Sequence, residues 1–296
     1  MLPPNDAEHD QAAGLRRLFA RRATTIVPLL AQAQASACLA ANLGVASARV
    51  GRRTLIVDET SGEVALAVGL AARCELAHVL AGDRTLRQAV LAVAEDVDLL
   101  PATRGLAQLA ERGLALDDVL NELPRRPAVV LVHACAARRA LFNAHGGLVI
   151  PIGAGAAALT EAYTELKRCA TRGSEIRAFA HSVADADTAY EQYAALAAAA
   201  TRFLASPVRY AGFVPQDAAF ARARHQRRTV FDVDAEAPSA RALESLAAKL
   251  VEDRQDRALC TRPLQRAVQR LGRRAVQALP PESEEMAPPS TAAITH

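Results

Sequence analysis

Short apolar runs alternate with helix-period segments along the middle of the chain. The runs are too short for core helices and predict buried strands, at residues 25–30, 54–57, 97–100, 128–132, 148–152, 176–180 and 208–214. Segments with apolar residues at helical spacing, many rich in Ala and Leu, lie between them and include residues 35–50, 156–171 and 187–204. This alternation predicts an α/β fold, with a doubly wound, mainly parallel sheet and helices on both faces.

The length and composition predict one large domain with tails. The chain has 296 residues and 51% hydrophobic content, which is enough for a full α/β core. We expect an N-terminal arm at 1–22, the α/β domain at 23–255, a basic helix at 256–280 and a disordered proline-rich tail at 281–296.

The composition also indicates where in the cell the protein is expected and which classes of partner it is expected to bind. The chain has no run of eighteen apolar residues and no apolar segment near its start that resembles a signal peptide, so we expect a cytoplasmic protein. A net charge of +3 is too small to argue for nucleic acid binding. The cysteines are expected to be buried thiols, since none are spaced as a C-x-x-C pair: Cys38, Cys74, Cys135, Cys169 and Cys260.

Residues 10–19 predict a short amphipathic helix that Asp10 can cap. Ala12, Leu15, Leu18 and Phe19 share one face, whereas Arg16 and Arg17 lie off it. A lone helix of about ten residues is marginal in water. It therefore either packs on its own domain or folds on a partner.

The pattern D-Q-A-x-x-L-R, formed by Asp10, Gln11, Ala12, Leu15 and Arg16, resembles the activator helix of the FlhG/FleN family of flagellar-number regulators. Members of this family have a MinD/ParA-type ATPase domain. The resemblance implies that the helix docks on an FlhF-type GTPase and stimulates GTP hydrolysis. Four further segments are similar to motifs of the family: 160–167, 210–217, 224–230 and 237–240.

The family carries a phosphate-binding loop, K-G-G-V-G-K-T, between its first strand and helix. Asn42 and Leu43 resemble an N-L pair later in that helix, and this anchor aligns the loop with Ala31, Gln32, Ala33, Gln34, Ala35, Ser36 and Ala37. Every glycine and both lysines are missing. Glycine allows backbone N–H groups to curl around phosphates, and lysine offsets phosphate charge. The resemblance therefore predicts that phosphate binding is lost.

The other nucleotide-binding elements are also altered. Asp58 and Gly62 match the family's L-L-D-A-D-x-G segment, but Thr60 stands in place of its second Asp. His133 replaces the Asp of the family's I-I-D-T strand, and an imidazole there would bind magnesium poorly. His181 replaces the Asn of the base-binding V-N-M-V segment. We therefore expect no cofactor, whereas the family uses ATP and magnesium.

Two residue groups suggest other chemistry. His133 and Cys135 lie two residues apart at a strand end, with His145 further along, and could form part of a metal site. Glu95, Asp96 and Asp98 stand at the entry to a strand. No complete ligand set is evident, so structural roles are favoured over an independent hydrolase or metalloenzyme.

Residues 264–279 predict a basic amphipathic helix that begins after Pro263 and ends at Pro280. Its apolar stripe includes Leu264, Val268, Leu271, Ala275 and Leu279, and its other side carries Arg266, Arg270, Arg273 and Arg274. Such a helix either lies on an anionic membrane or packs its stripe on the domain. Its placement is similar to that of the membrane-targeting helix of MinD-type proteins.

Together these features predict an FlhG-like pseudo-ATPase that regulates flagellar assembly or number through an FlhF-type GTPase. One alternative is a MinD-like ATPase that still binds nucleotide through an atypical loop. Another is a non-catalytic scaffold for a flagellar switch protein or a flagellar transcription activator. A peripheral position at the inner face of the cytoplasmic membrane would follow from the basic helix.

Overall fold

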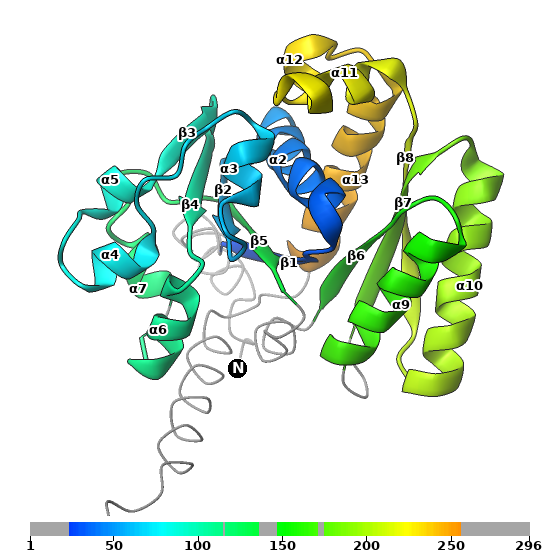
Figure 1. The fold of residues 1–296 in the computed structure, drawn as a ribbon, viewed down its shortest axis with the longest axis horizontal. Coiled ribbons are helices and arrows are strands. Elements are labelled where there is room, and N and C mark those ends of the chain that lie inside the picture. The colour runs from blue at the N-terminus through cyan, green and yellow to red at the C-terminus, as the bar shows by residue number, and fades with distance from the viewer. Residues whose placement is uncertain (1–23, 115, 136–146, 171–174, 256–296) are drawn as a thin grey trace, which may run out of the picture.

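The computed structural model describes residues 24–114, 116–135, 147–170 and 175–255. Its centre is a sheet of eight strands in the order β3-β4-β2-β5-β1-β6-β7-β8 (Figure 1). Neighbouring strands are parallel except for the antiparallel pair β3 and β4 at one edge. The predicted α/β fold with a mainly parallel sheet is therefore confirmed.

The elements alternate along the chain as the apolar pattern predicts. The strands are β1 (Thr25–Leu30), β2 (Thr54–Asp58), β3 (Leu91–Ala94), β4 (Val97–Pro101), β5 (Val129–Ala134), β6 (Leu148–Ile152), β7 (Ile176–Val183) and β8 (Val208–Pro215). The helices are α2 (Ala33–Arg49), α3 (Glu63–Ala67), α4 (Leu76–Leu80), α5 (Leu86–Ala89), α6 (Gly105–Glu111), α7 (Leu116–Leu120), α9 (Ala156–Cys169), α10 (Ala186–Leu204), α11 (Ala218–Gln226), α12 (Val230–Val233) and α13 (Pro238–Gln255).

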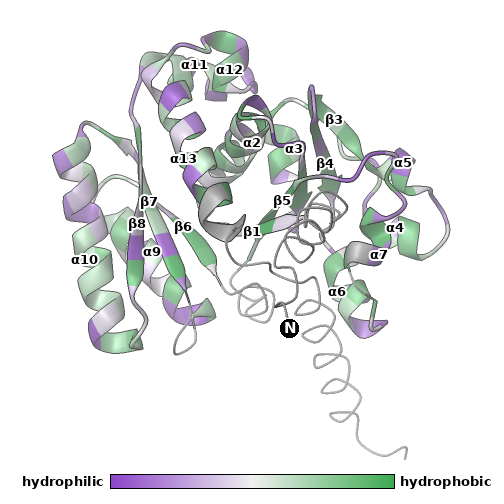
Figure 2. Ribbon diagram, turned by 180° about the vertical axis from the view of Figure 1, so that it is seen from behind, coloured by the Kyte–Doolittle hydropathy of each residue, from purple (hydrophilic) through white to green (hydrophobic). Residues whose placement is uncertain are grey.

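Helices cover both faces of the sheet and give two apolar cores. On one face α2 and α13 pack against each other and against the sheet, with residues such as Leu39 and Leu246 in the core. On the other face α9 and α10 pack with Leu166 and Leu196 in the second core. The strands between these layers are mostly hydrophobic along their length (Figure 2). Parallel strands that are buried on both faces read as continuous apolar runs.

The fold brings three strand ends together at one edge of the sheet. β1 lies between β5 and β6, and β5 lies between β1 and β2. In a parallel sheet the carboxyl ends of all these strands meet at the same edge. Asp58 ends β2 and is the register neighbour of His133 in β5. Only Ala31 and Gln32 separate β1 from α2, so the first turns of that helix lie directly above this edge.

Several predicted segments lie outside the described residues: the activator helix at 10–19, the basic helix at 264–279, the tail at 281–296, His145 and Cys260. Within the described ranges, no helix is both long and apolar enough to span a bilayer.

Candidate functional site

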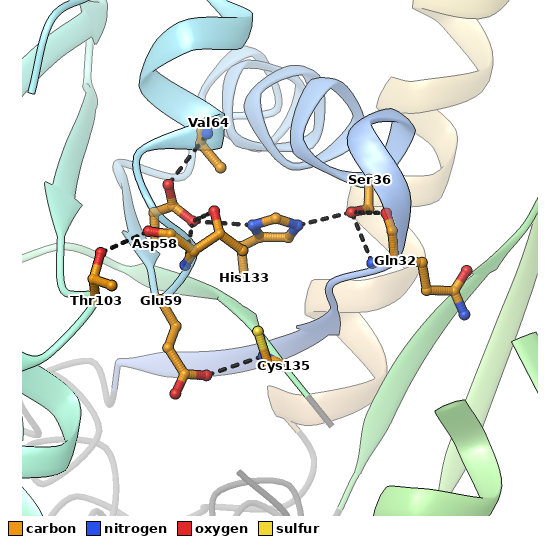
Figure 3. Close-up of polar contacts among 9 residues, drawn as sticks. Gln32, Ser36, Asp58, Glu59, Val64, Thr103, His133 and Cys135 are labelled. Carbon is orange, nitrogen blue, oxygen red and sulfur yellow. Dashed lines mark hydrogen bonds and ion pairs between the residues drawn. The ribbon is translucent and has the colours of Figure 1, made fainter. Parts of the chain in front are cut away.

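A buried hydrogen-bonded chain joins Ser36, His133 and Asp58 at the carboxyl edge of the sheet (Figure 3). Nδ1 of His133 lies 3.1 Å from Oδ1 of Asp58, and its Nε2 lies 2.9 Å from Oγ of Ser36. The three residues come from β5, β2 and α2. Their exposed fractions are 2% for Ser36 and 0% for the other two. Buried polar groups need partners of this kind, and here each residue supplies one for the next.

Asp58 is fully engaged by the protein itself. Its Oδ1 accepts hydrogen bonds from the backbone N–H of Thr60 at 3.0 Å and from the Thr60 hydroxyl at 2.6 Å, in addition to its contact with His133. Its Oδ2 accepts a bond of 3.2 Å from the N–H of Val64, at the start of α3. Both carboxylate oxygens are thus held by donors of this chain, which leaves little lone-pair capacity for a metal ion.

In the segment aligned with the family's phosphate loop, the backbone N–H groups of Ala31 and Gln32 are hydrogen-bonded within the protein. The N–H of Ala31 donates to the carbonyl of Ala134 at 2.8 Å, and the N–H of Gln32 donates to Oγ of Ser36 at 2.9 Å. The Ser36 hydroxyl also contacts the carbonyl of Gln32. None of residues 31–37 has positive φ, and Gln32 is extended with φ −135°. The backbone therefore lacks the positive-φ loop that would curl around phosphates ahead of α2.

Other contacts brace the same edge of the sheet. Thr103 donates from its hydroxyl to the carbonyl of Thr60 at 2.7 Å. The carboxylate of Glu59 accepts a bond of 3.0 Å from the N–H of Cys135, just beyond the end of β5. Figure 3 shows these side chains around the Asp58–His133 contact. The loops after β2, β4 and β5 are therefore cross-linked to one another.

The residues present do not fit ATP and magnesium. No lysine stands in the loop to offset phosphate charge, and the aligned positions from 33 to 37 lie in the first turns of α2. The side chains of Ser36 and Asp58 are both hydrogen-bonded to His133 rather than available to a ligand. Within the part of the chain that the structure describes, no group of three His, Cys, Asp or Glu side chains is placed to hold a metal ion.

The Ser36–His133–Asp58 chain has the connectivity of a nucleophile, base and carboxylate, but a hydrolytic role does not follow. A serine nucleophile has to meet its substrate at a distance of about 3 Å. Ser36 is 2% exposed, and neither Ser36 nor His133 lines the cavity described next. The hydrogen-bonded Ser36–His133–Asp58 chain instead links α2, β5 and β2 to one another.

A cavity of about 230 Å³ lies at the other side of α2, at the ends of β7 and β8. Cys38 and Ala35 line it from α2, His181 from β7, and Phe220 and Arg224 from α11. Burial, with the positive charge of Arg224, lowers the pKa of His181 from 6.5 to about 4, so this imidazole is neutral at pH 7. Burial also raises the pKa of the Cys38 thiol, which is therefore protonated.

The sequence prediction for the cysteines is correct only in part. Cys38 and Cys169 are buried and Cys74 is half-buried, but Cys135 is exposed. It follows the last residue of β5, where the chain leaves the sheet, and its side chain is separated from the buried His133 by one residue. Both ring nitrogens of His133 are held by Asp58 and Ser36, so His133 and Cys135 do not form a common metal site.

The acidic residues at the entry to β4 have a structural role. Asp96 and Asp98 each pair with the guanidinium group of Arg53, at N–O distances of 2.6 Å. This clamp ties the start of β4 to the residue that precedes β2, while Glu95 points to solvent.

Several segments that resemble motifs of the family are far apart in the sequence but touch one another in the structure. The Asn42 side chain accepts a hydrogen bond from the N–H of Val230 at 2.8 Å and donates to the carbonyl of Cys38. Asp217 caps α11 through the N–H of Phe220 and accepts a second bond from the N–H of Ser239, both at 2.7 Å. The sequence did not identify Asp217 as a junction between two helices. Its position at the end of a strand, three residues before Phe220, was the available signal.

Solved structures with the same fold were found by comparison. A ParA-family ATPase from Chlorobium tepidum has a TM-score of 0.58 at 15% identity, over 76% of this chain and 98% of that one. MinD from Aquifex aeolicus, in its complex with MinC, has a TM-score of 0.57 at 14% identity, over 77% and 95%. The cell division ATPase MinD from Pyrococcus furiosus has a TM-score of 0.56 at 19% identity, over 77% and 98%.

No protein-family model matches this chain, and no curated protein matches its sequence. The likeness to the solved structures covers nearly the whole of each of those chains, at identities that establish the architecture alone. This chain has the fold of the MinD and ParA-type ATPases.

Proposed function

We propose that this chain is an FlhG-like regulator of flagellar assembly or number that works without nucleotide. Its partner is an FlhF-type GTPase, on which residues 10–19 dock. The α/β domain then serves as a carrier and positioning unit rather than an ATPase. Flagellar switch proteins or a flagellar transcription activator are further candidate partners.

The proposed loss of nucleotide binding rests on one observation, the hydrogen-bonded chain formed by Ser36, His133 and Asp58. By the sequence resemblance, these residues correspond to the family's phosphate-binding lysine, its magnesium-linked aspartate and the first aspartate of its L-L-D-A-D-x-G segment. Each is bonded to the next at 3.1 Å or less. ATP and magnesium would have to break these contacts and bury phosphate charge without a lysine, which is unfavourable.

The proposed action on the partner rests on the resemblance at the N-terminus. Asp10 and Arg16 would fix the helix on the GTPase, while Leu15, Leu18 and Phe19 provide apolar contact. Gln11 would approach the nucleotide of the partner, where a glutamine can orient the attacking water. Because the motif is local, its effect on GTP hydrolysis does not require an active domain behind it.

The experiment measures GTP hydrolysis by the cognate FlhF-type GTPase with the full-length chain and with a peptide of residues 1–20. Both should accelerate hydrolysis. Gln11→Ala should remove most of the acceleration while binding is kept, because a residue that acts on the water contributes mainly in the transition state. Leu15→Asp should abolish binding, since it places a charge in an apolar contact.

Arg17→Gln is the matched control, because Arg17 lies outside the motif and off the apolar face. It should stimulate as the original chain does. Binding without acceleration would move the assignment to the scaffold function. An equally active Gln11→Ala variant would contradict the role given to that side chain.

The cavity beside His181 favours a second candidate, an ATPase that binds nucleotide through an atypical loop. It lies at the strand that resembles the base-binding segment of the family. At about 230 Å³ it is smaller than the pockets of roughly 300–1,000 Å³ that hold drug-sized ligands. The phosphates would still face the Ser36–His133–Asp58 chain, so we place this function second.

A further inference from the structure

All four tyrosines of the chain lie on α9, α10 and β8, at the end of the sheet formed by β7 and β8. Tyr190, Tyr193 and Tyr210 form a cluster, which we call the tyrosine patch. Their ring centroids lie 4.9 to 5.9 Å apart, with the Tyr190 and Tyr210 rings edge to face. The hydroxyl of Tyr193 donates to the carbonyl of Val208 at 2.9 Å and fixes the patch to the start of β8.

The tyrosine patch is open to solvent although it is largely aromatic. Tyr190 is 58% exposed and Tyr210 is 36% exposed. Between residues 186 and 204, α10 carries only Asp187, Glu191 and Arg202 as charged residues, and many of the others are alanines. β8 is the last strand of the sheet, and among the described residues it pairs with β7 alone. Exposed aromatic surface beside a free strand edge is typical of an interaction site.

The edge of β8 presents different chemistry on its two faces. Tyr210 packs on the α10 side, and because successive side chains of a strand alternate, Arg209 lies on the side covered by α13. The Arg209 side chain is 67% exposed and is 3.8 Å from Glu175. A ligand that crosses the edge of β8 therefore meets a cation first and then aromatic rings.

The C-terminal segment of this chain carries the groups that such a surface would bind: acidic side chains for the cation and prolines for the aromatic rings. Residues 280–289 read Pro-Pro-Glu-Ser-Glu-Glu-Met-Ala-Pro-Pro, with three glutamates between two proline pairs. Prolines favour the extended polyproline conformation, which docks on aromatic-lined surfaces at low entropic cost. The glutamates complement Arg209, and the pair Pro288 and Pro289 complements the rings.

The length of chain outside the structure allows this contact. α13 begins beside α12 and packs along β8 (Figure 1). Its 18 residues span about 27 Å at a helical rise of ~1.5 Å per residue, which matches the length of β8. The chain therefore leaves α13 near the end of the sheet at which β8 begins. With the helix expected at 264–279, which spans about 24 Å, and residues 256–263 extended over about 27 Å, the connection can still bridge roughly 50 Å.

We propose that the proline-rich C-terminal segment, residues 280–289, docks on the tyrosine patch of its own chain across the free edge of β8. Docked there, residues 280–289 would cover the aromatic rings and the outer edge of β8. Their tether gives them an effective concentration on the order of millimolar, so weak contacts suffice.

Tyrosine emission tests this directly, because the chain has no tryptophan and three of its four tyrosines are in the patch. Iodide quenching is measured on the full-length chain and on a variant with Pro280, Pro281, Pro288 and Pro289 changed to Ser. We expect the variant to lose protection from iodide. A synthetic peptide of residues 278–291, added at millimolar concentration, should restore it. The control Thr291→Ala with Thr295→Ala should keep the original protection.

Tyr210→Ala supplies a second arm, since this exposed ring can be removed without opening the core. In this background the proline changes should have little further effect on quenching, whereas Tyr210→Phe should behave as the original. Equal quenching of the original and the proline variant overturns the proposal. Protection that rises with protein concentration also overturns it, because a second copy would then cover the patch.

Discussion

Nδ1 of His133 and Oδ1 of Asp58 lie 3.1 Å apart on neighbouring parallel strands, with both side chains fully buried. The two residues are register partners of β5 and β2. Their contact continues through Nε2 of His133 to Ser36 in α2. The three side chains therefore fill the carboxyl edge of the sheet between β2, β5 and α2, and the contact should contribute to folding.

Removal of either partner should destabilise the domain. Asp58→Ala and His133→Ala each leave a buried polar group without its partner, which should lower the free energy of unfolding by about 2–5 kcal/mol. The double variant should lose less than the two single losses together, since directly contacting residues couple by about 0.5–3 kcal/mol. Urea unfolding at pH 7 measures all three.

Glu244→Ala is the matched control, because Glu244 pairs with Arg49 at the surface, at 2.5 Å. An exposed pair contributes less than about 1 kcal/mol. If His133→Ala costs no more than this control, or if the two single losses add without coupling, the buried contact does not hold the domain together.

Asp217 should link stability to acid pH. Burial acts to raise the pKa of Asp217, but hydrogen bonds from the N–H groups of Phe220 and Ser239 outweigh it, and the pKa lies below its usual 3.8. A lowered carboxylate pKa stabilises the folded state above the usual value, and this contribution is lost as the pH falls through the lowered value. Asp217→Ala should cost about 1–2 kcal/mol at pH 7, and the cost should shrink below pH 3.8.

The comparison for this variant is Asp185→Ala, which removes the cap of α10 alone. Asp185 accepts a hydrogen bond from the N–H of Thr188 at 2.8 Å, in the first turn of its own helix. Thermal unfolding across pH should show a larger loss for Asp217→Ala. Equal losses would mean that the bond to Ser239 adds nothing.

His181 should weaken the domain in mild acid. Its pKa is about 4 in the folded state because of burial and Arg224, against 6.5 when it is exposed. Below pH 6.5 the unfolded chain binds a proton that the folded chain does not, so stability falls until the pH reaches about 4. Over the interval between these two pKa values, the free energy of unfolding should fall by about 3 kcal/mol, at ~1.4 kcal/mol per pH unit.

His181→Gln should flatten this part of the stability profile, as measured by urea unfolding between pH 7 and pH 4. His225→Gln, a change at an exposed position of α11, should leave the slope as it is. A slope unchanged by His181→Gln would show that this imidazole is not held neutral in the fold.

The basic helix proposed at residues 264–279 should bind anionic vesicles. Arg266, Arg270, Arg273 and Arg274 should contribute about 1 kcal/mol each near a charged surface, and salt should screen them. Changing all four to Gln should abolish sedimentation with vesicles of anionic lipid. Since the proposed function involves no nucleotide, it predicts that binding by the original chain is the same with and without ATP.

The control changes Arg84, Arg87, Arg222 and Arg241 to Gln, which alters net charge equally at exposed sites of the domain. It should sediment as the original chain does. Equal loss in both variants would assign the binding to overall charge rather than to this helix.

The sequence predicted the fold well where burial is continuous. The ends of β1 and β6 agree with the predicted ranges, and β5 is displaced by one to two residues, because its last residues are a histidine and an alanine. β3 was missed. It has four residues, of which alternate ones are exposed, and it pairs antiparallel with β4 at the edge of the sheet. Such a short half-exposed run has no strong apolar signal.

The candidate site was predicted one residue at a time. Ser36, Asp58 and His133 were each compared with a family motif, and the sequence did not indicate that they bond to one another. Ser36 and His133 are 97 residues apart, and only the sheet order β2-β5-β1 brings them together. Pairing of this kind depends on strand register, which an apolar pattern leaves open.

Calorimetric titration of the full-length chain with ATP and magnesium tests the central claim most directly. We predict no binding heat at physiological ATP concentration, because Ser36, His133 and Asp58 are buried and hydrogen-bonded to one another and the phosphate-loop glycines and lysines are missing. The Ser36→Lys variant should also give no binding heat, since restoring one member of a set of residues that act together does not restore the whole. Magnesium-dependent binding with a dissociation constant in the micromolar range would contradict the account.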